Sequence, residues 1–193
     1  MTLNASSRLT RPSDPPMPHP RPAVEMWQRR GVAPPDLRSV MRRFATGVCL
    51  AATYSDHAGG RRHDAVTVNS LTSLSLDPPL VSVCLSRESL FLADLLSSGK
   101  WAVSILGDAS MALAQSCALD RATRTRTVPD LPATPGHHTG ALILDGSSWL
   151  ECVVWDSFDV GDHILVVGEV VALDDGQNSS ALVFLHGQYH ALE

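Results

Sequence analysis

Long apolar stretches are missing from this chain of 193 residues. No run approaches the roughly 18 apolar residues that a membrane-spanning helix needs, so we expect no membrane contact. The N-terminus lacks the apolar segment of a signal peptide, which predicts a cytoplasmic location. The net charge of −5 argues against a broad nucleic-acid interface. A hydrophobic content of 44% in a chain of this length predicts one globular domain with a substantial core.

The cysteines form no paired motif. None of Cys49, Cys84, Cys117 and Cys152 belongs to a Cys-x-x-Cys pair, so neither a zinc site nor a dithiol redox site is predicted. Cys49, Cys84 and Cys152 lie in apolar, strand-like runs. We therefore interpret them as buried, unreactive thiols.

Other reactive motifs are missing as well. His186 and His190 are four residues apart, but Gly187 between them argues against a helical metal-binding face. The pair His137-His138 has no acidic partner at ligand spacing, so we predict no metal site. The chain contains no Gly-x-Gly-x-x-Gly, no phosphate-binding P-loop and no Gly-x-Ser-x-Gly element. A nucleotide would therefore have to be held in another way.

The first 35 residues differ in composition from the rest of the chain. Eight of the thirteen prolines fall in residues 1–35, together with five arginines and little apolar periodicity. Proline fixes φ and removes a hydrogen-bond donor. We therefore predict a disordered tail over residues 1–35 and a folded domain over residues 36–193.

Strand patterns dominate the remainder, with a few short helices. Asp36 is a suitable N-cap for a helix whose apolar residues recur from Leu37 to Phe44, and Gly47 suits its end. Strands are predicted at 48–53, 65–68, 80–85, 101–106, 148–155, 163–173 and 183–185, and further helices at 89–96 and 108–117. Many strands with two or three short helices favour a closed or nearly closed antiparallel barrel.

The most informative segment is Thr67-Val-Asn-Ser-Leu-Thr-Ser-Leu-Ser-Leu-Asp-Pro-Pro-Leu80. Five hydroxyls and one amide fall within its first nine residues, and Asp77-Pro-Pro then turns the chain into the apolar run 80–85. Such a turn between two strands leaves a polar edge, rich in backbone groups, at the end of a sheet. This edge can form hydrogen bonds with a flat ligand that is rich in heteroatoms.

Residues 119–140 show no apolar rhythm, and we predict a long loop there. No Phe, Tyr or Trp occurs between Trp101 and Trp149. The arginines of this stretch can either serve an adenylate or pyrophosphate group or form the solvated surface of a loop. They are Arg121, Arg124 and Arg126.

From about residue 36 to its end, the chain resembles the flavin reductase-like family, the reductase partners of two-component flavin monooxygenases. The matching elements, in the expected order, are 37–48, 67–80, Leu150-Glu-Cys152, Gly161-Asp-His163 and Gly168-Glu-Val170. The resemblance implies a mainly β fold with short helices, the split β-barrel, and usually a homodimer. It also implies binding of FMN or FAD, oxidation of NADH or NADPH, and a flavin-dependent monooxygenase as the functional partner.

The resemblance also implies a set of site residues. Backbone N–H groups of residues 67–75 would face the pyrimidine edge of the flavin and stabilise the negative charge that appears there on reduction. His163 lies on the element that the family often places near the nicotinamide, where a neutral imidazole could orient a carboxamide or an imidazolium could lie near reduced flavin. The implied cofactor-binding residues are Thr67, Val68, Asn69, Ser70, Ser75, Ser86, Arg87 and Ser89, and the implied catalytic residue is His163. Turn chemistry alone would also account for Asn69 and Ser70, and a hairpin position for His163.

Two departures from the family pattern stand out. After Cys84, members usually continue with a basic residue and small hydroxyls that cradle the flavin phosphate, whereas this chain reads Leu-Ser-Arg-Glu-Ser-Leu-Phe-Leu over 85–92. Arg87 and Ser89 suit a phosphate, but a carboxylate at ~4 Å from it is repelled by about 1 kcal/mol in water. Either Glu88 points away, or flavin binds weakly, or the phosphate site has been given up. The second departure is the missing Phe and Trp of residues 119–140.

Three functions remain open on these grounds. The first is an NAD(P)H-dependent flavin reductase that supplies reduced flavin to a partner monooxygenase in bacterial secondary metabolism. The second is a barrel that has lost flavin reduction and acts as a cyclase-like enzyme or a binding protein for another apolar metabolite. The third is a flavoprotein that keeps its cofactor and carries out its own oxidation.

Overall fold

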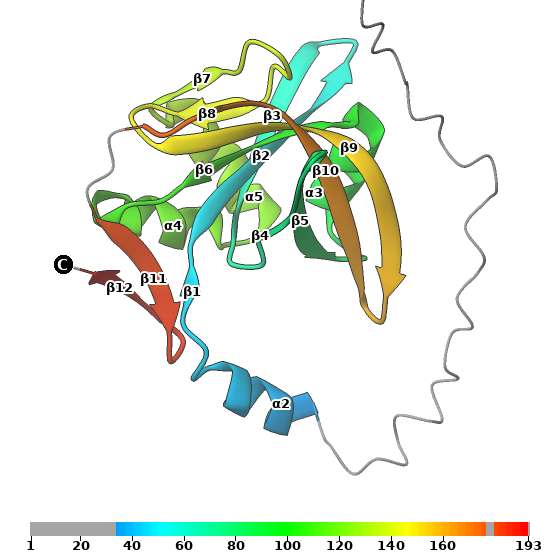
Figure 1. The fold of residues 1–193 in the computed structure, drawn as a ribbon. Coiled ribbons are helices and arrows are strands. Elements are labelled where there is room, and N and C mark those ends of the chain that lie inside the picture. Colours follow the sequence, from blue (N-terminus) through cyan, green and yellow to red (C-terminus); the bar gives the residue numbers. More distant parts are fainter. Residues whose placement is uncertain (1–33, 177–179, 193) are drawn as a thin grey trace, which may run out of the picture. The chain divides into compact units, whose positions relative to one another are not determined.

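The computed structural model describes residues 34–176 and 180–192 of the chain, and strands dominate it (Figure 1). By its contacts the chain divides into two units, residues 1–39 and 40–193, and all the strands that the structure describes lie in the second. The prediction of a mainly β fold with short helices is confirmed. The predicted tail lies outside the described residues, except that α2 (Pro34–Met41) begins at its last two positions.

The main sheet is antiparallel and contains seven strands in the order β3-β2-β6-β9-β10-β5-β4. Their bounds are β2 (Cys49–His57), β3 (Gly60–Val68), β4 (Thr72–Leu76), β5 (Pro79–Ser86), β6 (Lys100–Ile105), β9 (Ser148–Val160) and β10 (His163–Asp174). The strands predicted at 48–53 and 65–68 form the antiparallel pair β2–β3, which is longer than predicted because residues 53–57 pair with 60–64 as well. β4 and β5 are joined by the predicted Asp-Pro turn, whose Asp77–Pro78 peptide is cis.

The two edges of this sheet are neighbours along the chain. β3 and β4 stand at opposite ends of the strand order, yet only residues 69–71 separate them. The right-handed twist between neighbouring strands accumulates over seven strands and curls the sheet until its edges approach. Ser70 anchors the link between these edges to β5, the neighbour of β4, because its hydroxyl accepts the Cys84 amide at 3.0 Å and donates to the Cys84 carbonyl at 3.1 Å. The sheet is therefore a nearly closed barrel, as the strand count predicted.

Two main hydrophobic cores support this barrel. In the first, α3 (Leu90–Ser98) places Phe91 and Leu95 against strand residues such as Trp101 and Val166, all of them fully buried. The helix ends at Gly99, where φ is +65° and the amide bonds to the Leu95 carbonyl at 2.9 Å. The helix predicted at 89–96 is thus confirmed with a slightly later start and end.

The second core packs residues of α4, η2, β8 and β11 against β2 and the end of β6. These four belong to a set of smaller elements. The set consists of β1 (Thr46–Gly47), η1 (Asp108–Ser110), α4 (Met111–Cys117), α5 (Arg121–Thr127), η2 (Val128–Asp130), β7 (Ala133–Pro135), β8 (Leu142–Leu144), β11 (Ala181–Leu185) and β12 (Gln188–Leu192). β1, β11 and β12 form a three-stranded sheet, and β7 pairs with β8. Leu50 and Leu106 pack here against Cys117, Leu144 and Leu182.

The prediction of a structureless loop over 119–140 is wrong. This stretch contains α5, η2 and β7, and Asp120 caps α5 by accepting the Thr123 amide at 3.1 Å. The buried residue of this helix is Arg124, which is only 8% exposed. A helix whose inward side chain is an arginine carries no apolar periodicity, and so the sequence pattern does not reveal it.

The N-terminal helix also differs from its prediction. α2 begins at Pro34, two residues before the proposed N-cap Asp36, because proline suits the first turn of a helix. It ends at Met41, so Phe44 lies beyond it and Gly47 belongs to β1.

The cysteines are free thiols, and burial governs their chemistry. Burial raises the pKa of the Cys49 and Cys152 thiols to about 12 and that of Cys117 to about 11. Cys84 is half-buried, and burial raises its pKa as well. The predicted burial is confirmed for Cys49 and Cys152, whereas Cys84 is only half-buried. A raised pKa keeps a thiol protonated and poorly reactive at neutral pH. No helix in the part of the chain that the structure describes is long and apolar enough to cross a membrane.

A test of the barrel packing lies where β10 passes Trp101. A Cβ atom added at Gly168 would come within 2.6 Å of the Trp101 ring, which is fully buried. We expect Gly168→Ala to lower the free energy of unfolding by about 1–3 kcal/mol, because this core would be overpacked. Urea denaturation followed by tryptophan fluorescence measures the change. Gly59→Ala is the matched control, since nothing lies within 4 Å of its added Cβ; equal stability losses in both variants would contradict the packing argument.

Candidate functional site

The link between the barrel edges forms the centre of the candidate site. Asn69 is exposed, and its side-chain amide donates to the Thr46 hydroxyl at 3.2 Å. Ser70 is held on β5 by its two bonds to Cys84. Their side chains therefore fix the path of the chain, which leaves backbone groups rather than these side chains to contact a ligand.

The residues just before this link point into the protein. The Thr67 hydroxyl donates to the Ala114 carbonyl at 2.7 Å, and Val68 is buried in the first core. Neither side chain is accessible for a flavin ring, so only their main chain fits the predicted role. Ser75 lies half-buried on β4, where it pairs with Leu80 of β5.

The C-terminal end of β5 carries the candidate phosphate partners. Ser86 is exposed at the end of the strand. The guanidinium of Arg87 forms an ion pair with Asp159 and also donates to the Gly161 carbonyl at 3.0 Å. The Arg87 amide bonds to the Asp162 carbonyl at 3.0 Å. Arg87 therefore fastens the β9–β10 hairpin to β5, and Asp159 already balances its charge.

The start of α3 offers further donors beside Arg87. Ser89 precedes the helix in an extended conformation, and its hydroxyl makes no capping hydrogen bond. The first turn of α3 contains no acidic residue. Its orphan N–H groups and the helix dipole favour an anion. Glu88 is exposed in the turn before the helix.

His163 is the first residue of β10 and lies at the same end of the sheet. Its Nδ1 is 2.7 Å from an Asp162 carboxylate oxygen, and the pair lies in the turn of the β9–β10 hairpin. The hydrogen bond from His163 and the nearby positive charge lower the pKa of the Asp162 carboxyl. Asp162 thus holds the imidazole in one orientation, whichever function the ring has.

Strand β5 brings these groups together. Ser70 bonds to Cys84, and Ser86, two residues further on, lies directly opposite His163 in the β5–β10 pairing. The predicted residues 69–70, 86–89 and 163 therefore gather at one end of the barrel. Thr67, Val68 and Ser75 lie on the adjoining strands. The residues that hold these side chains in place were not predicted as site residues. They are Asp159, Asp162 and Thr46. Asp162 lies within the Gly161-Asp-His163 element, but only His163 of that element was predicted to have a role.

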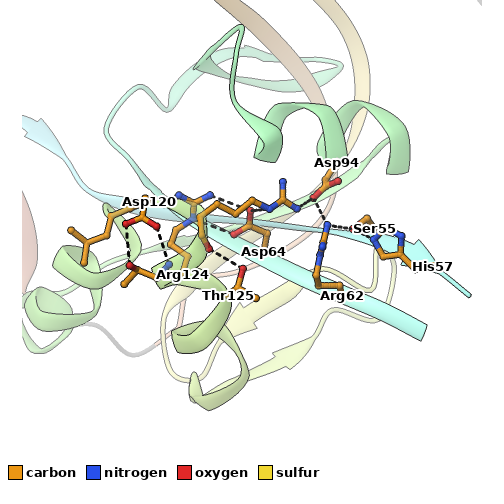
Figure 2. Close-up of polar contacts among 11 residues, drawn as sticks. Ser55, His57, Arg62, Asp64, Asp94, Asp120, Arg124 and Thr125 are labelled. Atoms are coloured by element: carbon orange, nitrogen blue, oxygen red, sulfur yellow. Dashed lines mark hydrogen bonds and ion pairs between the residues drawn. The ribbon is translucent and has the colours of Figure 1, made fainter. Parts of the chain in front are cut away.

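Two arginines of residues 119–140, Arg121 and Arg124, belong to a second polar cluster (Figure 2). Arg124 makes a bidentate pair with Asp64 of β3, with both N–O distances at 3.1 Å. Arg121 pairs with Asp94 of α3 and lies 3.8 Å from Asp64. Asp64 is 3% exposed, so this is a buried ionic link between α5, β3 and α3. Arg121 and Arg124 therefore fit neither interpretation of these arginines. They are paired with aspartates, so they are neither free for a nucleotide nor part of a solvated loop.

His138, of the pair His137-His138 in the same stretch, lies beside the buried carboxylate of Glu151. The buried carboxylate of Glu151 accepts the amides of His138 at 3.0 Å and Thr139 at 2.7 Å, and the Thr139 hydroxyl at 2.7 Å. Gly136 lies against this carboxylate, since a Cβ there would come within 2.3 Å of it. No group of three or more His, Cys, Asp or Glu side chains within residues 34–176 and 180–192 could hold a metal ion.

Comparison with known proteins identifies the family. The family pattern described as "Flavin reductase like domain" matches residues 41–193. The chain belongs to the flavin reductase-like family. Its fold is the split barrel of that family, as the resemblance implied.

Individual relatives agree with this assignment. The chain is 35% identical over 167 residues to an NADH-dependent flavin reductase of a Rhodococcus species, covering 84% of this chain and 88% of the relative. It is 32% identical over 160 residues to a probable flavin reductase of Rhizobium meliloti, covering 81% of this chain but spanning only 48% of that longer protein. The crystal structure of BorF, the flavin reductase component of a bacterial two-component tryptophan halogenase, matches with a TM-score of 0.74 and 35% identity, covering 82% of this chain and 97% of that one.

The buried ion pair gives a direct test of what holds α5 in place. Asp64→Asn leaves the Arg124 guanidinium buried without its charge partner, so we expect the free energy of unfolding to fall by about 3–5 kcal/mol. Asp56→Asn is the matched control, because Asp56 makes the same two-bond contact with Arg61 at the surface. Thermal and urea unfolding compare the two, and we expect Asp56→Asn to stay close to the parent protein. Similar stability of both variants would mean that the buried pair does not fasten α5.

Proposed function

We propose that this protein is an NAD(P)H-dependent flavin reductase that supplies reduced FMN or FAD to a partner monooxygenase, in bacterial secondary metabolism. The observation that carries the proposal is the gathering of residues 69–70, 86–89 and 163 at one end of a flavin reductase-like barrel. NADH-dependent flavin reduction and the two-component role are named for relatives.

The main chain from Thr67 to Ser70 would hold the flavin ring. The Thr67 hydroxyl is already bonded to Ala114 and the Ser70 hydroxyl to Cys84, so the segment is rigid before a ligand arrives. Preformed N–H donors lose little on binding and stabilise charge that develops on a ligand. Flavin, when bound, supplies the chemistry by accepting a hydride from the reduced nicotinamide.

The turn from Ser86 to Ser89 would receive the flavin phosphate. The uncapped Ser89 hydroxyl and the first turn of α3 fit an anion. Arg87 fits it less well, because a phosphate would compete with Asp159 for the guanidinium. This arrangement favours loose flavin binding, which suits a reductase whose reduced flavin must leave for another enzyme. His163, oriented by Asp162, would contact the nicotinamide.

The second candidate is a barrel that no longer reduces flavin and acts on or binds another apolar metabolite. The pairing of Arg87 with Asp159, together with Leu90 and Phe91 in place of small hydroxyls, is the observation that favours it. A cytoplasmic location stays a prediction under either function.

The decisive experiment is an assay of NADH and NADPH oxidation at 340 nm with free FMN and FAD. We expect turnover with added flavin, and a loss of at least about tenfold in kcat/KM for Asn69→Leu, because the turn beside the proposed ring site would lose its bond to Thr46. Gln115→Leu is the control, because it also replaces a side-chain amide by leucine, at an exposed position of α4, and it should leave turnover unchanged. Absence of turnover with either nucleotide, in protein that unfolds cooperatively, would favour the second candidate. Flavin that stays bound through gel filtration would favour a flavoprotein with its own oxidation.

We also propose that the protein is a homodimer. Trp155, Phe158 and Val160 of β9 and Leu173 of β10 expose large apolar side chains on one hairpin. Trp149, the other tryptophan of β9, is half-buried against the small core of Tyr54, Ala102 and Ile143, so it is not part of this surface.

Sedimentation velocity tests the dimer directly. We expect a species of twice the 20.7 kDa chain, and dissociation when Phe158→Lys places a charge in the apolar surface. Glu88→Lys, at an exposed position outside this hairpin, is the control for added charge. A parent protein that sediments as a monomer at all concentrations would contradict the proposal.

A further inference from the structure

A cavity of about 470 Å³ opens beside the first residues of β3, between this strand, the α5–η2 segment and the β7–β8 pair. Arg62 and His63 of β3 line it, as do Thr125 of α5, Val128, Leu131 and Leu142. Asn69 lies seven residues further along the chain, which is roughly 20 Å at the rise of a strand. The cavity is therefore separate from the flavin-ring site proposed at residues 67–70, and it approaches the proposed phosphate turn only through Asp94, which contacts Arg62 and lies five residues along α3 from Ser89.

The composition of the surrounding segment explains the open space. No Phe, Tyr or Trp occurs between Trp101 and Trp149. The inner wall is formed by residues no larger than leucine and proline, with Val128 buried and Leu131 and Leu142 half-buried. A pocket of this size with an apolar wall and a few polar groups at one side is typical of a small-molecule site.

The charges around the cavity select the kind of ligand. Arg61 is paired with Asp56 and stacks on Tyr54, with its guanidinium carbon 3.6 Å from the ring centre. The cluster of Figure 2 contains Arg62, Arg121 and Arg124 but only two aspartates that pair with them, Asp64 and Asp94. None of the described residues that line the cavity is Asp or Glu. Arg62 thus shares the Asp94 carboxylate with Arg121 at the edge of an apolar pocket, while Asp120, the third carboxylate of the cluster, caps α5 through Thr123.

Arg62 is the less closely paired of the two arginines that share Asp94. Its side chain is 47% exposed, it lies 3.8 Å from Asp94, and it donates to the Ser55 hydroxyl at 3.3 Å. Arg121 makes the closer contact with Asp94. The guanidinium of Arg62 therefore keeps donors for a ligand, and its planar fork matches a carboxylate.

His63 adds a second polar group. Its Nδ1 is shielded from solvent and has no hydrogen-bond partner within the described residues, and its ring meets Tyr54 edge-on at 6.0 Å. Burial, and next the charge of Arg61, lower the pKa of His63. A ring in this setting favours the neutral form at pH 7, so it can bind a ligand oxygen without adding a further charge.

We propose that this cavity binds a small organic monoanion, with its carboxylate on Arg62 and an aromatic or other compact apolar body against Val128 and Leu142. The site is distinct from the flavin end of the barrel, and the proposal does not depend on the function proposed above. The carboxylate gains a charge-assisted contact at the only side of the pocket where the described lining is positive, while the body fills the space that larger side chains leave open.

Isothermal titration with two matched probes tests the proposal. The probes are 2-naphthoate and the neutral 2-naphthylmethanol, which share the ring body and differ in charge. We expect 2-naphthoate to bind with one site per chain and about tenfold more tightly than the alcohol, the difference that one charge-assisted contact gives. Saturating FMN should leave this binding unchanged.

Variants then locate the site. Arg62→Gln should weaken 2-naphthoate about tenfold and leave the alcohol unchanged, because only the charged contact is lost. Arg126→Gln removes an exposed arginine of α5 that does not line the cavity, and it should change neither affinity. Thr125→Trp, at an exposed position on the cavity wall, should block both probes.

Three results would overturn the proposal. One is equal affinity for the two probes, or an unchanged affinity of Arg62→Gln for 2-naphthoate, which would leave a non-specific apolar pocket. Another is displacement of 2-naphthoate by FMN, which would place the binding at the flavin end. The last is no binding by either probe up to its solubility limit, which would leave the cavity as a gap in the packing.

Discussion

The closure of the seven-stranded sheet is the constraint on which the rest of the structure depends. Its edge strands β3 and β4 are separated in the strand order by five others but in the chain by residues 69–71 alone. Ser70 anchors this link to β5 through both backbone groups of Cys84. The same short link is the proposed flavin edge, so the residues that complete the barrel also build its candidate site. The proposed flavin edge is rigid because the same hydrogen bonds also hold the barrel strands in place.

Ion pairs, rather than aromatic side chains, hold α5 against the barrel. Residues between Trp101 and Trp149 include no Phe, Tyr or Trp, and α5 is fastened instead by Arg124 on Asp64 and Arg121 on Asp94. Buried pairs of this kind fix the position of the helix, because each charge must keep its partner within hydrogen-bond reach. They fill less of the space between the elements than aromatic rings would. The open cavity next to them follows from that exchange, and Arg62 at its edge shares Asp94 with Arg121.

Much of the fold could be predicted because its signals are local. The Asp77-Pro-Pro turn and the apolar runs of β5, β6 and β10 are each set by neighbouring residues, and each is found where it was predicted. The failures share one cause. α5 was missed because its inward residue is charged, and β2 and β3 extend beyond the predicted strands through polar residues that pair only with each other. For the candidate site, the residue types at 69–70, 86–89 and 163 were predicted, but the partners that orient them were not.

The sequence by itself determined the strand-rich class, the polar edge before the double proline and the membership of a family whose pattern matches residues 41–193. The tertiary structure decided which of these polar groups are still available. It bound the Thr67 hydroxyl to Ala114, balanced Arg87 with Asp159 and buried Arg124 against Asp64. Those partners lie 47 to 72 residues apart in the chain. Hydrogen bonds and ion pairs act over a few ångströms of space, so only the folded chain can assign them.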